Sequence, residues 1–176
     1  MPLFPADFKP PRQVHFTDFQ LDVLSPKHAQ ADYQAVLASA DAIRHVFGPE
    51  NHWPPTDIGF DENLSDLQRH FNKFERAVAF AYSLLSPDKQ SYLGCLYIKP
   101  IKSRLEHDWR KQRFQAQAFL WLTVCDQPLR EEQTLAALQG WLARDWPWLS
   151  ISWPGREPSW EEWLSSQPNN DLRSLR

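Results

Sequence analysis

Asp66 and His70 are the two side chains in this sequence best suited to acid–base chemistry. They are four positions apart in a segment with helical hydrophobic spacing, so both side chains lie on one face of the predicted helix. A carboxylate in this position can orient the imidazole ring and favour its charged form, which suits a general base beside a cleft. The same spacing is common in solvated ion pairs on helix surfaces, and this alternative stays open. Asp66 and His70 are therefore the catalytic candidates.

Two further residues are candidates for binding a small substrate. Trp53 precedes two prolines in a segment that cannot be regular, so its indole could form the wall of a cleft. Arg156 follows the last predicted strand, and open α/β sheets often bind ligands beyond the carboxyl ends of their strands. Its guanidinium could hold an anionic group. Pairing with Glu157 or Glu161, which would fix the C-terminal segment, is an equally good interpretation.

The other histidines do not indicate a metal centre. His45, Glu50 and His52 are close in sequence, but their spacing matches no standard zinc pattern. His28 and Asp32 are also four residues apart, and we interpret them as a surface pair. We therefore expect no bound metal ion.

The composition predicts a globular protein of the reducing cytoplasm. The 176 residues are 42% apolar and 23% charged, and no stretch is long enough to span a membrane. The proline-broken N-terminus lacks the apolar core of an export signal, and Cys95 and Cys125 are expected to be free thiols. The net charge of −3 argues against duplex nucleic acid as a partner. The basic segment 102–113 contains acidic residues, so we interpret it as a solvated loop.

Hydrophobic periodicity predicts a mixed order of helices and strands. We expect a strand over 15–24, two helical stretches over 25–48, a helix that begins at Asp61, a hairpin of strands over 77–85 and 91–98, a strand over 117–124, a helix that begins at Pro128, a strand over 148–153 and a short helix around Trp160. The last strand–helix–strand unit should be a right-handed parallel crossover. It would bring Trp121, Trp141 and Trp153 into or beside one core layer.

These elements predict an α/β fold in which helices flank a mixed, mainly antiparallel sheet. The sheet is expected to be truncated at its C-terminal end, because few residues follow position 153. Residues 1–14 are predicted to form an extended N-terminal arm, residues 15–166 a single domain and residues 167–176 a polar tail.

Several short stretches carry a family resemblance: Phe47-Gly48, Trp53-Pro54, Asn63-Leu64-x-Asp66-Leu67, Leu93-Gly94-Cys95-x-Tyr97-Ile98 and Pro154-Gly155-Arg156. With the order of elements, they resemble the GNAT superfamily of acyl-coenzyme A N-acyltransferases, and within it a group of bacterial GNAT-like proteins. The resemblance implies a GNAT-like fold and acetyl-coenzyme A, or another acyl-coenzyme A, as cofactor. It also implies a small-molecule or amine acceptor. Neither duplex nucleic acid nor a membrane is expected as a partner, and a homodimer stays open.

In this superfamily, the pantetheine arm of the cofactor pairs with the fourth strand of the fold where it splays from the fifth. The pyrophosphate lies on backbone amides at the start of the next helix. The resemblance therefore implies that the backbone of Leu122 and Val124 holds pantetheine and that Arg130 meets the phosphates.

The stretch 124–132 departs from the glycine-rich loop of the superfamily. It contains no glycine, Pro128 lacks an amide donor, and Asp126, Glu131 and Glu132 place three carboxylates where pyrophosphate would bind. From the resemblance we expect an acyl-coenzyme A-dependent N-acyltransferase-like protein. From the departure in this stretch, its cofactor binding could be degenerate. The alternative is a non-enzymatic small-molecule-binding or protein-interaction module on a GNAT-like scaffold.

Overall fold

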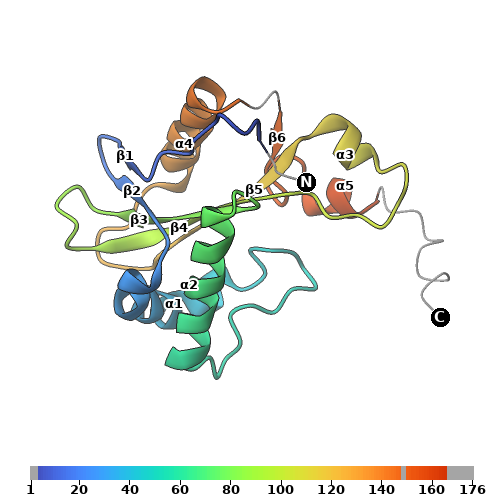
Figure 1. Ribbon diagram of the computed structural model, residues 1–176. Helices are drawn as coiled ribbons and strands as arrows, with labels where there is room; N and C mark the ends of the chain where they lie inside the picture. The colour runs from blue at the N-terminus through green and yellow to red at the C-terminus, as the bar shows by residue number, and fades with distance from the viewer. Residues whose placement is uncertain (1–3, 148–149, 166–176) are drawn as a thin grey trace.

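A six-stranded sheet organises the chain in the computed structural model, which describes residues 4–147 and 150–165 (Figure 1). Neighbouring strands in the order β1-β2-β3-β4-β5 are antiparallel, and β6 is parallel to β5. The strands are β1 (Gln13–His15), β2 (Gln20–Val23), β3 (Phe80–Leu85), β4 (Tyr92–Lys99), β5 (Ala116–Leu122) and β6 (Ile151–Ser152). The helices are α1 (Ala29–Ile43), α2 (Phe60–Glu75), α3 (Trp109–Arg113), α4 (Glu131–Asp145) and α5 (Trp160–Ser165), and the 3-10 helix η1 (Pro26–His28) precedes α1. The predicted α/β class is confirmed, and β6 is the last strand among the described residues.

Helices cover both faces of the sheet: α1 and α2 lie on one face and α4 lies on the other (Figure 1). Successive side chains of a strand point to opposite faces, so each central strand contributes to both layers. In β3, Phe80 and Tyr82 belong to the cluster on the α4 side, whereas Ala81 packs with the residues of α1 and α2. The predicted β3–β4 hairpin is confirmed, and the small side chain of Ala81 lies under α1 and α2.

The single strand predicted over residues 15–24 is replaced by two antiparallel strands, β1 and β2. Residues 17–18 form a bend, and the Phe16 N–H donates to the Phe19 carbonyl at 2.9 Å, which turns the chain between β1 and β2. Residues 4–12, which the sequence places in an arm, lie against the sheet. Phe4 is buried in the α4-side cluster, and the Tyr82 hydroxyl donates to the Pro11 carbonyl at 2.7 Å.

Three helix boundaries differ from the expectation. The second helical stretch before residue 48 is absent, because Arg44 is extended and His45 adopts a positive φ of 73°. Helix α2 begins at Phe60 after an N-cap at Gly59, so Asp61 lies in its first turn instead of capping it. Helix α4 begins at Glu131 because Arg130, its N-cap, is extended, so Pro128 precedes the helix.

The basic segment 102–113 is more ordered than a solvated loop. Asp108 caps α3 by accepting a hydrogen bond from the Arg110 N–H at 2.9 Å, and its carboxylate pairs with the Arg110 guanidinium at 2.6 Å. Both side chains are buried. The sequence prediction was wrong here because two charged residues that neutralise one another can be buried together.

The predicted parallel crossover from β5 through α4 to β6 is confirmed, with Ala116 opposite Ile151. Positions 148 and 149 of the last predicted strand lie outside the described residues. Trp141 and Trp153 pack in the α4-side cluster, but Trp121 packs on the α1 side. The expectation of one layer was therefore wrong for Trp121, because strand alternation directs its neighbour Leu120 toward α4.

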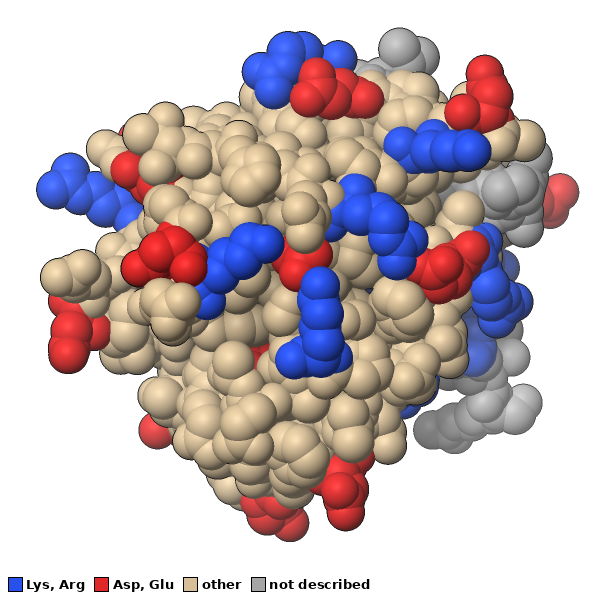
Figure 2. Space-filling model, turned by 60° about the vertical axis from the view of Figure 1, so that its left-hand side comes forward, with Lys and Arg blue, Asp and Glu red and all other residues tan. Residues whose placement is uncertain are grey.

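Acidic and basic side chains are interspersed over the surface seen in Figure 2, so this face carries no broad patch of one charge. None of the helices in the described part of the chain is long and apolar enough to cross a membrane.

Candidate functional site

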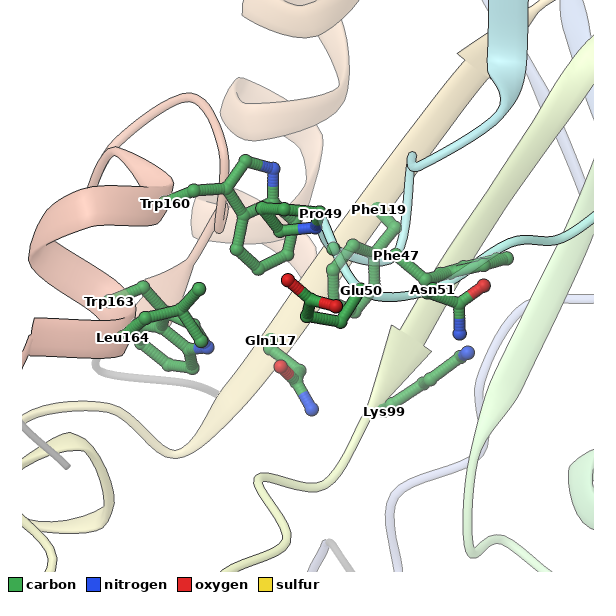
Figure 3. A pocket seen from close by; sticks show the side chains of 11 residues that line it. Phe47, Pro49, Glu50, Asn51, Lys99, Gln117, Phe119, Trp160, Trp163 and Leu164 are labelled. Atoms are coloured by element: carbon green, nitrogen blue, oxygen red, sulfur yellow. The ribbon is translucent and has the colours of Figure 1, made fainter. Parts of the chain in front are cut away.

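Two neighbouring hollows lie on the α1–α2 side of the sheet. The smaller has a volume of about 290 Å³ and is lined by residues of α2, β4 and the loop between α1 and α2. The larger has a volume of about 480 Å³ and extends from the end of β4 to α5 (Figure 3). Phe47, Asn51 and Lys99 line both hollows, so these three residues form their common wall.

The smaller hollow brings together three of the residues singled out in the sequence, Trp53, Asp66 and His70. Asp66 forms its ion pair with Arg69, one residue before His70. The His70 ring instead lies beside Tyr97, with a distance of 5.2 Å between the ring centroids. The predicted proximity of Asp66 and His70 is therefore present, but the carboxylate is bound to arginine.

The surroundings of His70 keep its imidazole neutral. Burial, together with the positive charges of Lys99, Lys73 and Arg69, lowers the pKa of His70 to about 3. A general base is most effective when its pKa is close to the working pH. At neutral pH, this imidazole is therefore a weak proton acceptor.

Asp32 lines the same hollow, and the sequence interpretation missed it. Its side chain is buried and accepts hydrogen bonds from the Tyr92 hydroxyl at 2.6 Å and the Asn63 amide at 2.8 Å, and burial raises its pKa. His28 lies near Asp22 instead, with 3.1 Å between Nε2 and Oδ2, so the expected surface pair does not exist. Tyr92 and Asn63 are far from Asp32 in sequence, so local spacing gave no signal for this contact.

Lys99, the last residue of β4, is the second residue that sequence analysis missed. Its ammonium lies 4.0 Å from the centroid of the Phe47 ring, in the common wall of the two hollows. Strand alternation puts it on the same face as Tyr97, and this pattern could have revealed it.

His45 and His52, in the loop after α1, lie beside one another, and His45 contacts the backbone of this loop. His45 Nδ1 lies 2.7 Å from the Asn51 carbonyl oxygen, and the rings of His45 and His52 are 5.4 Å apart. Within the described part of the chain, His, Cys, Asp and Glu side chains form no group of three that could hold a metal ion.

The residues expected to bind the cofactor lie elsewhere. Leu122 ends β5 opposite Gly94, and the Val124 N–H donates to Ser39 Oγ at 2.9 Å, so the Val124 amide is already used within the protein. Arg130 lines a third hollow of about 460 Å³ next to the β1–β2 turn, on the α4 side of the sheet. The structure therefore does not bring Arg130 together with Trp53 or His70.

Arg156 spans the edge of β5 and the start of α4. Its Nη2 donates to the Leu120 carbonyl at 3.0 Å and forms an ion pair with Glu131, the first residue of α4. Its partner is thus neither Glu157 nor Glu161, the two considered from the sequence. The contact is made possible by the tight loop after β6, in which the Trp153 N–H donates to the Glu157 carbonyl at 3.0 Å.

Trp160 packs on a side chain of the same strand, β5. Among the described residues, strands β5 and β6 pair at Ala116–Ile151 and Gln117–Ser152, so the second half of β5 has no described strand beside it on that side. There the Trp160 ring stacks on Phe119, with ring planes 17° apart and centroids 6.3 Å apart. Arg156 therefore contacts the edge of β5 beyond its pairing with β6, and Trp160 covers Phe119 on the α1–α2 face of the same strand.

Comparison with solved structures identifies acetyltransferases of similar architecture. One, from Salmonella typhimurium, modifies the N-terminal serine of the ribosomal protein L7/L12; it has a TM-score of 0.55 and 19% identity, over 75% of this chain and 68% of that one. A ribosomal L7/L12 alpha-N-protein acetyltransferase in complex with coenzyme A has a TM-score of 0.54 and 20% identity, over 73% of this chain and 66% of that one. The ribosomal-protein-S5-alanine acetyltransferase of Vibrio fischeri has a TM-score of 0.51 and 10% identity, over 74% and 66%.

No family model and no curated protein matches the sequence. The likeness is therefore one of architecture. The chain has the fold of the GNAT acyltransferase superfamily.

Proposed function

We propose that this protein is an N-acyltransferase-like member of the GNAT fold in which acyl-coenzyme A binding is degenerate, and that it binds a small molecule in the hollows beside β4. The observation that carries the proposal is the position of Arg156. Its guanidinium contacts the Leu120 carbonyl on β5 and the Glu131 carboxylate at the start of α4. These are the two places where the superfamily holds pantetheine and pyrophosphate.

The charge at the start of α4 supports the same conclusion. Glu131 and Glu132 lie in the first turn and complement the positive end of the helix dipole. An incoming pyrophosphate would have to approach these carboxylates and replace the contact between Glu131 and Arg156. The positive end of the α4 dipole is thus already neutralised by carboxylates of the chain itself.

A second candidate function is an active acyl-coenzyme A-dependent N-acyltransferase. The observation that favours it is the hollow containing Asp66 and His70 on a fold whose solved neighbours acetylate ribosomal proteins, one of them with coenzyme A bound. In this case, coenzyme A displaces Arg156 from β5, and an acceptor amine enters beside His70. The low pKa of His70 argues against this candidate, because a weak base removes a proton from an ammonium group inefficiently.

Isothermal titration calorimetry with coenzyme A and acetyl-coenzyme A separates the two candidates. We expect no saturable binding to the wild-type protein up to about 1 mM ligand, which corresponds to less than about 4 kcal/mol of binding free energy. A micromolar or tighter Kd would contradict the proposal and establish acyl-coenzyme A as a ligand.

Two variants then locate the phosphates if binding occurs. If Arg156 contacts the pyrophosphate, Arg156→Ala should weaken binding by about 1.5–3 kcal/mol, the contribution of a charged hydrogen bond. If Arg130 makes this contact, Arg130→Ala should have that effect instead. Arg144→Ala is the matched control, because it removes an exposed arginine near the far end of α4, which pairs with its neighbour Asp145.

A further inference from the structure

Lys99 is surrounded by aromatic rings at the junction of the two hollows. Its Nζ lies 4.0 Å from the centroid of Phe47, 5.4 Å from that of Tyr97 and 5.5 Å from that of Phe119. Each ring attracts the ammonium through its π face. These contacts hold the cation in place on a half-buried surface instead of leaving it to reach solvent.

In the part of the chain that the structure describes, no carboxylate forms an ion pair with this cation. Lys99 takes part in none of the ion pairs of the described residues. The acids of the smaller hollow have other partners: Asp66 pairs with Arg69, and Asp32 accepts hydrogen bonds from Tyr92 and Asn63. Burial and the charges of Lys73 and Lys102 lower the pKa of Lys99 to about 8, so most of the ammonium is still charged at pH 7.

The larger hollow, which Lys99 also lines, has flat aromatic walls. Trp160 and Trp163 approach it from α5, and Phe119 contributes from β5, whereas the Lys99 ammonium and the Asn51 amide lie at its other end (Figure 3). Glu50 lines the same hollow, and Lys99 forms no ion pair with its carboxylate. The hollow therefore has aromatic walls at the α5 end and the Lys99 ammonium at the other end, with the Glu50 carboxylate between them (Figure 3).

We propose that the larger hollow binds a small aromatic carboxylate, whose carboxylate pairs with Lys99 and whose ring lies against Phe119 and the tryptophans of α5. This inference rests on the proposed function, because it names the class of small molecule that the hollows beside β4 bind. A carboxylate in this position forms the ion pair that Lys99 lacks among the described residues. A partly buried ion pair is also screened less than one in water, so the charge contributes to affinity as well as to orientation.

The test compares phenylacetate with phenylacetamide, which has a closely similar shape and no charge, by calorimetry and ligand-observed NMR. Wild-type protein should bind phenylacetate at least about tenfold more tightly than the amide, as expected for a charge-assisted hydrogen bond. Equal affinities, or no binding of either compound at about 10 mM, would overturn the proposal.

Three variants assign the effect to Lys99. Lys99→Met keeps the length of the side chain and should remove the preference for phenylacetate, whereas Lys99→Arg should retain it. Lys102→Met is the matched control, because it removes the same charge from an exposed residue that does not line the hollow, and it should retain the preference. A preference that persists in a folded Lys99→Met protein would contradict the assignment.

Acetyl-coenzyme A distinguishes failure of this inference from failure of the proposed function. Tight acetyl-coenzyme A binding would overturn the degenerate cofactor site. The comparison of phenylacetate with phenylacetamide would still decide whether Lys99 binds a carboxylate. Absence of the phenylacetate preference overturns the carboxylate site, while the coenzyme A titration still decides the proposed function.

Discussion

The neutral imidazole of His70 should make folding sensitive to acid. Its pKa is about 3 in the folded protein and about 6.5 in the unfolded chain. Between these values, the unfolded chain takes up a proton that the folded protein does not, so stability falls as the pH falls. Replacing His70 with Gln should remove about 3 kcal/mol of the loss in unfolding free energy between pH 6.5 and pH 4, as measured by chemical denaturation.

His107→Gln is the control for this experiment, because His107 is exposed in the loop before α3. Its stability should follow the wild-type dependence on pH. If His70→Gln also follows the wild-type curve, the imidazole is protonated in the folded protein, and the argument against a base at this position fails.

At the level of elements, the packing of β4 on β5 depends on Gly94. Its φ is +148°, and a Cβ atom there would clash with the backbone carbonyl oxygen of Trp121 on β5. Neither backbone can move without disturbing the ladder between the central strands. Gly94→Ala should therefore lower the unfolding free energy by about 2–4 kcal/mol.

Gly140→Ala should raise the unfolding free energy, the opposite of the effect expected for Gly94→Ala. Gly140 lies in α4, and a Cβ atom there meets nothing within 4 Å. Alanine is favoured over glycine inside a helix, so this variant should gain about 0.5–1 kcal/mol. If Gly94→Ala is as stable as the wild-type protein, the close approach of β4 to β5 is incorrect.

The order of elements could be predicted because most of them carry a clear hydrophobic period. The alternation in β3 and β4 and the apolar run of β5 identified the central strands, and the crossover rule then fixed the parallel position of β6. The side of Trp121 could not be obtained in this way, since β5 is buried on both faces and carries large apolar residues on each.

The candidate site was predicted only where the residues share one helix. The spacing of Asp66 and His70 placed them on one face of α2, and the structure adds Trp53 to the same hollow. Asp32 was assigned to the surface because its partners Tyr92 and Asn63 come from other elements. The contact of Arg156 with Glu131 joins residues 25 positions apart through a loop whose conformation no local pattern specifies.

At the scale of the whole molecule, the segment after β6 determines which face of the protein remains open. Its Arg156 contacts the edge of β5, its Trp160 covers Phe119, and its helix α5 forms one wall of the larger hollow. In the proposed function, this one segment closes the position of an acyl-coenzyme A arm and forms part of a different site beside it. The account therefore predicts that ligands reach the β4 side of the molecule and not the β5 edge.

Amide NMR of the uniformly labelled wild-type protein tests this claim most directly. On addition of excess coenzyme A, the amide signals of Leu120, Leu122, Val124 and Glu131 should not shift, because Arg156 keeps its contacts with β5 and α4. Saturable shifts centred on these four residues would show that the cofactor displaces Arg156, and they would contradict the account.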